Sequence, residues 1–161
     1  MTAEQLNELL LSYEETEAKA LFECDYTLFS LLYSIYKDTP QKEIPDTFFM
    51  FMEIDGWQGM SQRCGVWQYY ESGAYEKGKL ERAADYLKAQ NEKEMADIFS
   101  LGIHDYAAPE YEENCGYPQE WLDEAENIDK WIYDNEEYIY NWKRRLVLSH
   151  KDEILKLAED K

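Results

Sequence analysis

Eight residues toward the C-terminal end recur at the spacing of one helix face. Successive members lie four, three, four, three, four, three and four positions apart, a heptad-like pattern that keeps their side chains on one stripe of an α-helix. They are Trp121, Ala125, Ile128, Ile132, Asn135, Ile139, Trp142 and Leu146. One long helix satisfies the pattern, and so do two stacked helices broken near Asn127 or Asn135. We expect this seam to pack into the core; the alternative is a seam that also builds a dimer.

The N-terminal part shows helical signals of the same kind. Thr2 with Gln5 three residues later forms a capping box ahead of a first helix. A second helix is expected over about residues 17–37, because Pro40 disfavours the helical conformation at Thr39. Its apolar positions include Leu21, Tyr26, Phe29, Leu32 and Tyr36.

Glycine and proline divide the middle of the chain. A third helix is expected to open at Ile44-Pro45-Asp46 and to end near Asp55-Gly56. A short segment follows at 66–71, and apolar spacing predicts further helices over about 80–91 and 95–101.

Residues 104–117 contain Pro109 and Gly116 without a clear period, so they are interpreted as a long loop. The sequence contains no pair of strand-like runs joined by a hairpin turn and no internal repeat. We therefore expect an all-α protein, a compact single-domain multi-helix fold over residues 1–161 with a long C-terminal helical segment.

The charge balance limits the classes of partner. The 161 residues include 35 Asp and Glu against 16 Lys and Arg, a formal net charge of −19. Such a chain repels a phosphate backbone, which excludes direct binding to nucleic acid. The 14 Tyr, 5 Trp and 6 Phe indicate an aromatic core rather than a disordered acidic chain.

The cysteines and the first residues indicate a cytoplasmic protein. Cys24, Cys64 and Cys115 are odd in number and widely spaced, which argues against a disulfide framework. Five acidic residues precede the first basic residue, Lys19, whereas a signal peptide begins with basic residues. The longest apolar run, 48–52, is too short to span a membrane.

No pattern in the sequence points to an enzyme, a metal site or a cofactor. His104 and His150 do not have zinc-ligand spacing. His104 beside Asp105 has the chemistry of an oriented base, and Arg63 beside Cys64 can activate a thiol. For both His104 and Cys64, a structural role is the favoured interpretation. We therefore expect no catalytic activity.

The acidic residues are concentrated in one quarter of the chain. Residues 103–142 hold twelve acids against Lys130 alone, a net charge of −11 in 40 residues. The acids are Asp105, Glu110, Glu112, Glu113, Glu120, Asp123, Glu124, Glu126, Asp129, Asp134, Glu136 and Glu137. This concentration suggests a dedicated acidic surface.

A helical wheel selects four of these acids as a possible surface that imitates DNA. Asp123, Glu126, Asp134 and Glu137 fall within about 80° of one another, opposite the seam, over about 21 Å. One such row is sparser than the phosphates of a DNA strand. A second acidic element is therefore needed, either the 104–117 segment or the acidic N-terminal start. In the 104–117 segment the candidate residues are Glu110, Glu112 and Glu113.

The hypothesis is that carboxylates occupy the places of phosphates in a basic DNA-binding site. The alternative is an acidic helical protein-interaction module whose charge only keeps it soluble and whose aromatic seam binds a partner helix. Binding that falls steeply with salt distinguishes the first from the second.

The stretch Gly65-Val66-Trp67-Gln68-Tyr69-Tyr70 resembles an all-helical bacterial family of mostly unknown function. That family carries the motif G-[F/V]-x-Q-[Y/F]-[Y/F], usually after Asn-Gly-Gly, where this chain has Arg63-Cys64-Gly65. The resemblance covers roughly residues 44–101. In size and acidity the chain is similar to a DNA-mimic member of that family. This resemblance implies an all-α fold and a homodimer. It also implies that the protein binds a helix-turn-helix transcription factor and thereby blocks the factor's contacts with its operator.

Overall fold

The computed structural model describes residues 1–112 and 116–158. In these ranges the structure is all-helical and contains no strand, which confirms the predicted fold class. The chain forms two compact units, Met1–Asp55 with Asn135–Lys161, and Gly56–Asp134. The unit boundaries fall inside α3 (Asp46–Arg63) and between α8 and α9. The expectation of a single domain stays a prediction.

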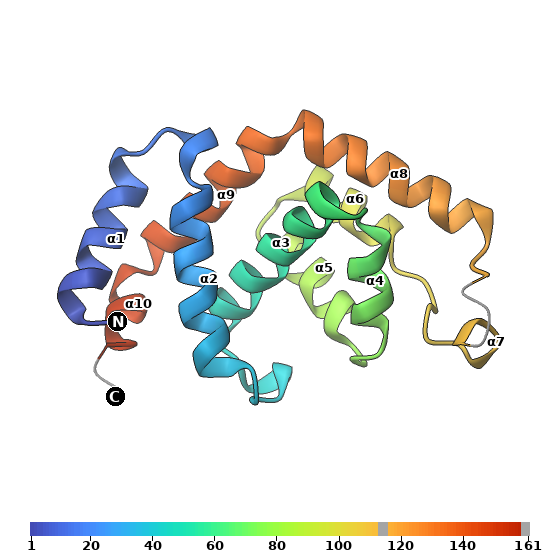
Figure 1. Ribbon diagram of the computed structural model, residues 1–161, viewed down its shortest axis with the longest axis horizontal. Coiled ribbons are helices and arrows are strands. Elements are labelled where there is room, and N and C mark those ends of the chain that lie inside the picture. The colour runs from blue at the N-terminus through green and yellow to red at the C-terminus, as the bar shows by residue number, and fades with distance from the viewer. Residues whose placement is uncertain (113–115, 159–161) are drawn as a thin grey trace. The chain divides into compact units, whose positions relative to one another are not determined.

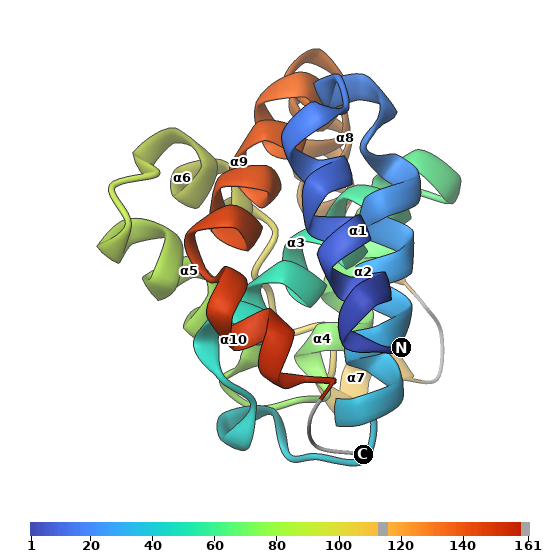
Figure 2. The same cartoon turned by 90° about the vertical axis from the view of Figure 1, so that its left-hand side faces the viewer.

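The first unit is built around the N-terminal and C-terminal helices. Its elements, besides the first part of α3, are α1 (Ala3–Glu15), η1 (Ala18–Ala20), α2 (Phe22–Tyr36), η2 (Gln41–Glu43), α9 (Glu136–Ser149) and α10 (Lys151–Lys156). The predicted capping box is confirmed: the Thr2 backbone N–H donates to Gln5 Oε1 at 2.9 Å, and the Gln5 N–H donates to Thr2 Oγ1 at 3.2 Å. α1 packs against α2, α9 and α10 (Figure 2).

A buried charge cluster lies in the core of this unit. Lys143 Nζ lies 2.6 Å from Asp25 Oδ2 and 2.7 Å from Asp55 Oδ1, and the Tyr13 hydroxyl donates to Asp25 Oδ1 at 2.8 Å. Burial alone lowers the pKa of Lys143, but the two carboxylates outweigh it and the net shift is upward. Burial raises the pKa of Asp25, against the opposing effects of Lys143 and Tyr13.

The second unit has an aromatic core. Its elements, besides the last part of α3, are α4 (Trp67–Ala74), α5 (Lys79–Ala89), α6 (Lys93–Leu101), α7 (Pro109–Glu112) and α8 (Gln119–Asp134), and α5 packs against α4 and α6 (Figure 1). Trp57 Nε1 donates to the Tyr70 hydroxyl at 2.9 Å, and that hydroxyl donates to the Phe99 carbonyl oxygen at 2.8 Å. All three side chains are fully buried. Gly102 lies so close to the Tyr70 ring that a Cβ there would overlap it.

Three predicted boundaries are wrong. α3 continues through Gly56 and Gly59 to Arg63, because a helix-interior glycine costs only about 1 kcal/mol and buried neighbours such as Trp57 outweigh that cost. The predicted second helix is divided into η1 and α2. The 104–117 loop contains the short helix α7, which begins at Pro109, a residue that suits the first turn of a helix.

The C-terminal segment is two helices broken at Asn135, one of the predicted alternatives. Asn135 has φ −116° and ψ 22°, outside helical geometry. Six seam residues are buried within the chain, which confirms the interpretation of a seam packed into the core. They are Ala125, Ile128, Ile132, Ile139, Trp142 and Leu146.

Candidate functional site

The face of α8 opposite its buried side displays three of the predicted carboxylates. Asp123, Glu126 and Asp134 are all exposed. Since helix geometry places them within about 80° of one another over about 16 Å, they form a single row on one rigid element. We call Asp123, Glu126 and Asp134 the acidic row.

Two other residues share this side of α8. Lys130 is exposed and lies four positions after Glu126 and four before Asp134, so it falls within the row. Tyr133 is 82% exposed, the most exposed of the large apolar side chains in the described part of the chain. The row is therefore a carboxylate surface with one cation inside it and one aromatic ring at its edge.

Two acids of α8 that were included in the predicted acidic surface make contacts within the fold instead. Glu124 Oε2 lies 2.5 Å from Nε2 of His104, and Asp129 Oδ1 accepts a hydrogen bond from the Val66 backbone N–H at 3.0 Å. Both carboxylates are half-buried. The exposed charge of α8 is accordingly smaller than its composition indicates.

The stretch that carries the family resemblance also has structural roles. Gly65 has φ +98°, a conformation that favours glycine, and a Cβ there would lie 3.0 Å from Trp67 Cδ1. Val66 is the N-cap of α4, and its N–H binds Asp129, a carboxylate suited to the positive end of the helix. Tyr70 belongs to the aromatic core. These residues start a helix and fill the core.

The remaining predicted site residues do not join the acidic row on one helix. Glu110 is exposed on α7. The side chain of Glu112 and the whole of Glu113 lie outside the described residues. Glu137 is exposed on α9, but the continuous helix that the wheel assumed is interrupted at Asn135, and Glu137 belongs to the other compact unit.

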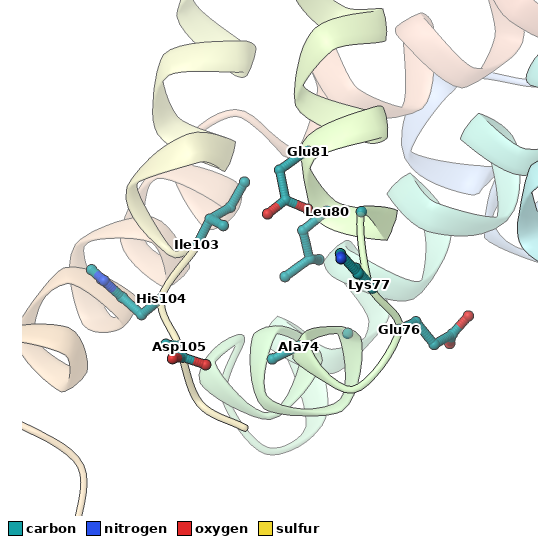
Figure 3. A pocket seen from close by; sticks show the side chains of 10 residues that line it. Ala74, Glu76, Lys77, Leu80, Glu81, Ile103, His104 and Asp105 are labelled. Carbon is teal, nitrogen blue, oxygen red and sulfur yellow. The ribbon is translucent and has the colours of Figure 1, made fainter. Parts of the chain in front are cut away.

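A second candidate site is a pocket that the sequence did not reveal. The pocket, of about 370 Å³, lies between Lys77 and Glu81 on one side and His104 and Asp105 on the other (Figure 3). Its lining comes from two segments, residues 73–81 and 103–105, that share no periodic pattern. Its charged lining consists of three carboxylates and one lysine, Glu76, Glu81 and Asp105 with Lys77.

His104 is held by contacts other than the neighbour expected from the sequence. Its ring stacks on Trp121 with centroids 4.6 Å apart and planes 2° apart, and its bonded carboxylate is Glu124 rather than Asp105. Cys64 is exposed at the end of α3, with Sγ 3.7 Å from Met60 Sδ. Burial raises the pKa of the Cys24 thiol, which keeps that thiol protonated.

No family model, curated protein or solved structure matches this chain. The family resemblance of residues 44–101 therefore stays a prediction.

No group of three or more His, Cys, Asp and Glu side chains in residues 1–112 and 116–158 is arranged to hold a metal ion. None of the helices in those ranges is both long enough and apolar enough to cross a membrane.

Proposed function

We propose that this protein is a cytoplasmic DNA mimic that acts as a homodimer. It presents a carboxylate surface to the DNA-binding site of a helix-turn-helix transcription factor, blocks operator binding and thereby regulates transcription. The resemblance in size, acidity and the 65–70 stretch to the nineteen-kilodalton bacterial DNA mimic protein supports this proposal.

The observation that carries the proposal is the acidic row on α8. A helix fixes the relative positions of Asp123, Glu126 and Asp134, so their charges are presented without the entropic cost of ordering a loop. Lys and Arg side chains that neutralise phosphates in an operator complex would meet these carboxylates instead. Because both ligands need the same cations, binding of one excludes the other.

The geometry limits how much DNA one row imitates. Three carboxylates over about 16 Å compare with one phosphate per about 3.4 Å of a DNA strand. The row by itself therefore suits a DNA-binding protein whose operator contacts include only a few phosphates, rather than one that follows a long stretch of duplex.

A second function is favoured by Lys130 and Tyr133. A cation within the row weakens its resemblance to DNA, and an exposed tyrosine beside it is typical of protein interfaces. The alternative is thus an acidic helical protein-interaction module that docks by apolar contact, with charge that only solvates the surface. This module would bind its partner with little dependence on salt.

The test uses two sets of charge-neutralising substitutions in the second unit. The first set is Asp123→Asn, Glu126→Gln and Asp134→Asn. The control set is Glu81→Gln, Asp85→Asn and Asp97→Asn, exposed acids of α5 and α6 that change the net charge equally. The immobilised protein is exposed to host lysate, the DNA-binding proteins eluted by salt are identified, and each is assayed on its fluorescent operator duplex.

Mimicry predicts that the wild-type protein displaces the operator, that the first set loses this activity at least tenfold, and that the control set retains it. Lys130→Glu should strengthen displacement, because it removes the cation from the row. Equal losses in both sets would show that only overall charge matters. Binding that resists salt, or capture of a protein that binds no DNA, would favour the interaction module.

A further inference from the structure

Helix α2 carries an exposed line of aromatic side chains. Phe22, Tyr26 and Tyr33 are 58%, 64% and 56% exposed, and the half-buried Phe29 stacks on Tyr33 with centroids 6.1 Å apart and planes 10° apart. Their spacing of four, three and four residues places all four within about 60° on the helix. We call these four residues the aromatic stripe.

The aromatic stripe lies outside the core of the first unit. The buried apolar residues of α2 are Cys24, Leu28, Leu31 and Leu32, on the other side of the helix. Single exposed apolar residues are common on proteins, but three large aromatic side chains, each more than half exposed and in line on one helix, mark an interaction surface.

A shallow hollow borders the stripe. It is about 610 Å³ in volume and is lined by Tyr26, Ser30 and Ser34 of α2 together with Met1 and Gln5 at the start of α1. α1 and α2 lie side by side in the first unit (Figure 2). The hollow offers room for side chains from an opposing helix, with hydroxyl groups at its edge.

We propose that the aromatic stripe binds α2 of a second copy of this chain, with the two helices antiparallel. The order of spacings, four, three and four, is the same in both directions along the helix. An antiparallel copy therefore places Phe22 opposite the second copy's Tyr33, and Tyr26 opposite its Phe29, so every aromatic side chain meets another.

Charge also favours the antiparallel arrangement. Glu23 is exposed in the first turn of α2 and Lys37 is exposed at its C-cap. Antiparallel helices bring each Glu23 toward the second copy's Lys37 and join opposite ends of the helix dipoles. Parallel helices would bring like charges together.

The size of the stripe sets the expected affinity. Three aromatic side chains of roughly 200 Å² each, more than half exposed, offer on the order of 350 Å² per copy. A standard interface buries about 800 Å² per partner, so flanking residues must supply the rest. Since each chain also carries a charge of −19, we expect a dissociation constant of about 1–100 µM.

Salt separates this dimer from mimicry. Repulsion between two strongly acidic chains is screened by salt, so raising ionic strength should strengthen the dimer. Binding of the acidic row to a basic partner should weaken under the same change. The interface rests on the homodimer of the proposed function and gives that dimer its contact surface, but operator displacement by the acidic row is measured separately, so failure of the dimer and failure of mimicry are distinguishable.

The test is sedimentation equilibrium of the full chain from about 1 µM to about 1 mM at low and high salt, a range that brackets the expected affinity. Wild-type protein should dimerise, and Tyr26→Glu and Tyr33→Glu should each weaken the dimer at least tenfold. The matched control is Tyr75→Glu, which changes a tyrosine 58% exposed outside the stripe and should leave the dimer intact.

Charge reversal tests the orientation and needs no change to the aromatic residues. Glu23→Lys should weaken the dimer, and Glu23→Lys combined with Lys37→Glu should restore it.

A wild-type protein that is monomeric over the whole range overturns the proposal. So does a dimer that survives Tyr26→Glu in a folded variant, or a stripe that binds a different protein while the chain stays monomeric. If the aromatic variants fail to fold, the charge-reversal variants provide the test. A dimer whose dissociation constant is the same in wild type, in Glu23→Lys and in the double variant refutes the antiparallel arrangement.

Discussion

The Asp129 carboxylate binds the backbone N–H of Val66, 63 positions earlier in the chain, at 3.0 Å. This hydrogen bond places a negative charge at the N-terminus of α4, where the helix dipole and an otherwise unpaired N–H both favour it. The contact ties α8 to the start of α4 and gives the stretch around Gly65 its place in the fold.

Asp129→Ala should therefore destabilise the protein by about 0.5–2 kcal/mol, the range observed for loss of an N-terminal helix cap. Asp123→Ala, an exposed acid on the same helix, should change stability by less than about 0.5 kcal/mol. Urea unfolding followed by circular dichroism measures both. Equal effects of the two substitutions would mean that the Val66 contact contributes nothing.

Lys143→Met should destabilise the protein by about 3–5 kcal/mol, because it leaves the buried Asp25 carboxylate without its cation. Adding Asp25→Asn to Lys143→Met should recover part of this loss, since the uncompensated charge is then removed. The free energies of unfolding of the two single variants and the double variant form a thermodynamic cycle. Strictly additive effects would contradict the coupling.

Two glycine substitutions should change the stability of the protein in opposite directions. Gly102→Ala places a methyl group against the buried ring of Tyr70 and should cost about 1–3 kcal/mol. Gly59→Ala lies inside α3 with nothing within 4 Å of the new Cβ, and should stabilise by about 0.5–1 kcal/mol. Thermal unfolding of the two variants beside the wild type tests the pair. A Gly102→Ala protein as stable as wild type would disprove the close packing.

Three buried tyrosines should resist ionisation in alkali. Burial is the main cause that raises the pKa of Tyr106 to about 12 and the pKa values of Tyr13 and Tyr70 well above the ordinary value. Since the folded state keeps protons that the unfolded state loses, this stability is complete below about pH 10 and is lost as the pH rises through the folded pKa values.

Ultraviolet absorbance of tyrosinate during a pH titration measures this directly. Tyr13, Tyr70 and Tyr106 should ionise only together with loss of helical circular dichroism. Tyr106→Phe should remove one late-titrating group at little cost in stability, because the Tyr106 hydroxyl is buried without a hydrogen-bond partner in the described residues. Ionisation of these three tyrosines in a protein that keeps its helical circular dichroism would contradict the burial.

The parts of the fold that local patterns determine could be predicted from the sequence. The Thr2 capping box follows from local spacing, and so does the burial of six seam residues, although α8 and α9 divide the seam at Asn135. The end of α3 could not be predicted, because the burial of Trp57, a tertiary effect, outweighs the weak helix propensity of Gly56 and Gly59.

The candidate surfaces could be predicted only in part. Exposure of Asp123, Glu126 and Asp134 follows from helix geometry and the position of the seam. The hydrogen bond of Asp129 depends on Val66, which is remote in sequence. Likewise α2 is apolar on two sides, and periodicity alone did not indicate that Leu28 and Leu32 face the core while Tyr26 faces solvent.

The buried cluster of Lys143, Asp25 and Asp55 also constrains how the sequence can diverge. Loss of Lys143 leaves the buried Asp25 carboxylate without its cation, whereas Asp55 is partly exposed and its loss still leaves Lys143 paired with Asp25. Positions 25 and 143 should therefore covary among descendants of this chain, and position 55 should be freer to change.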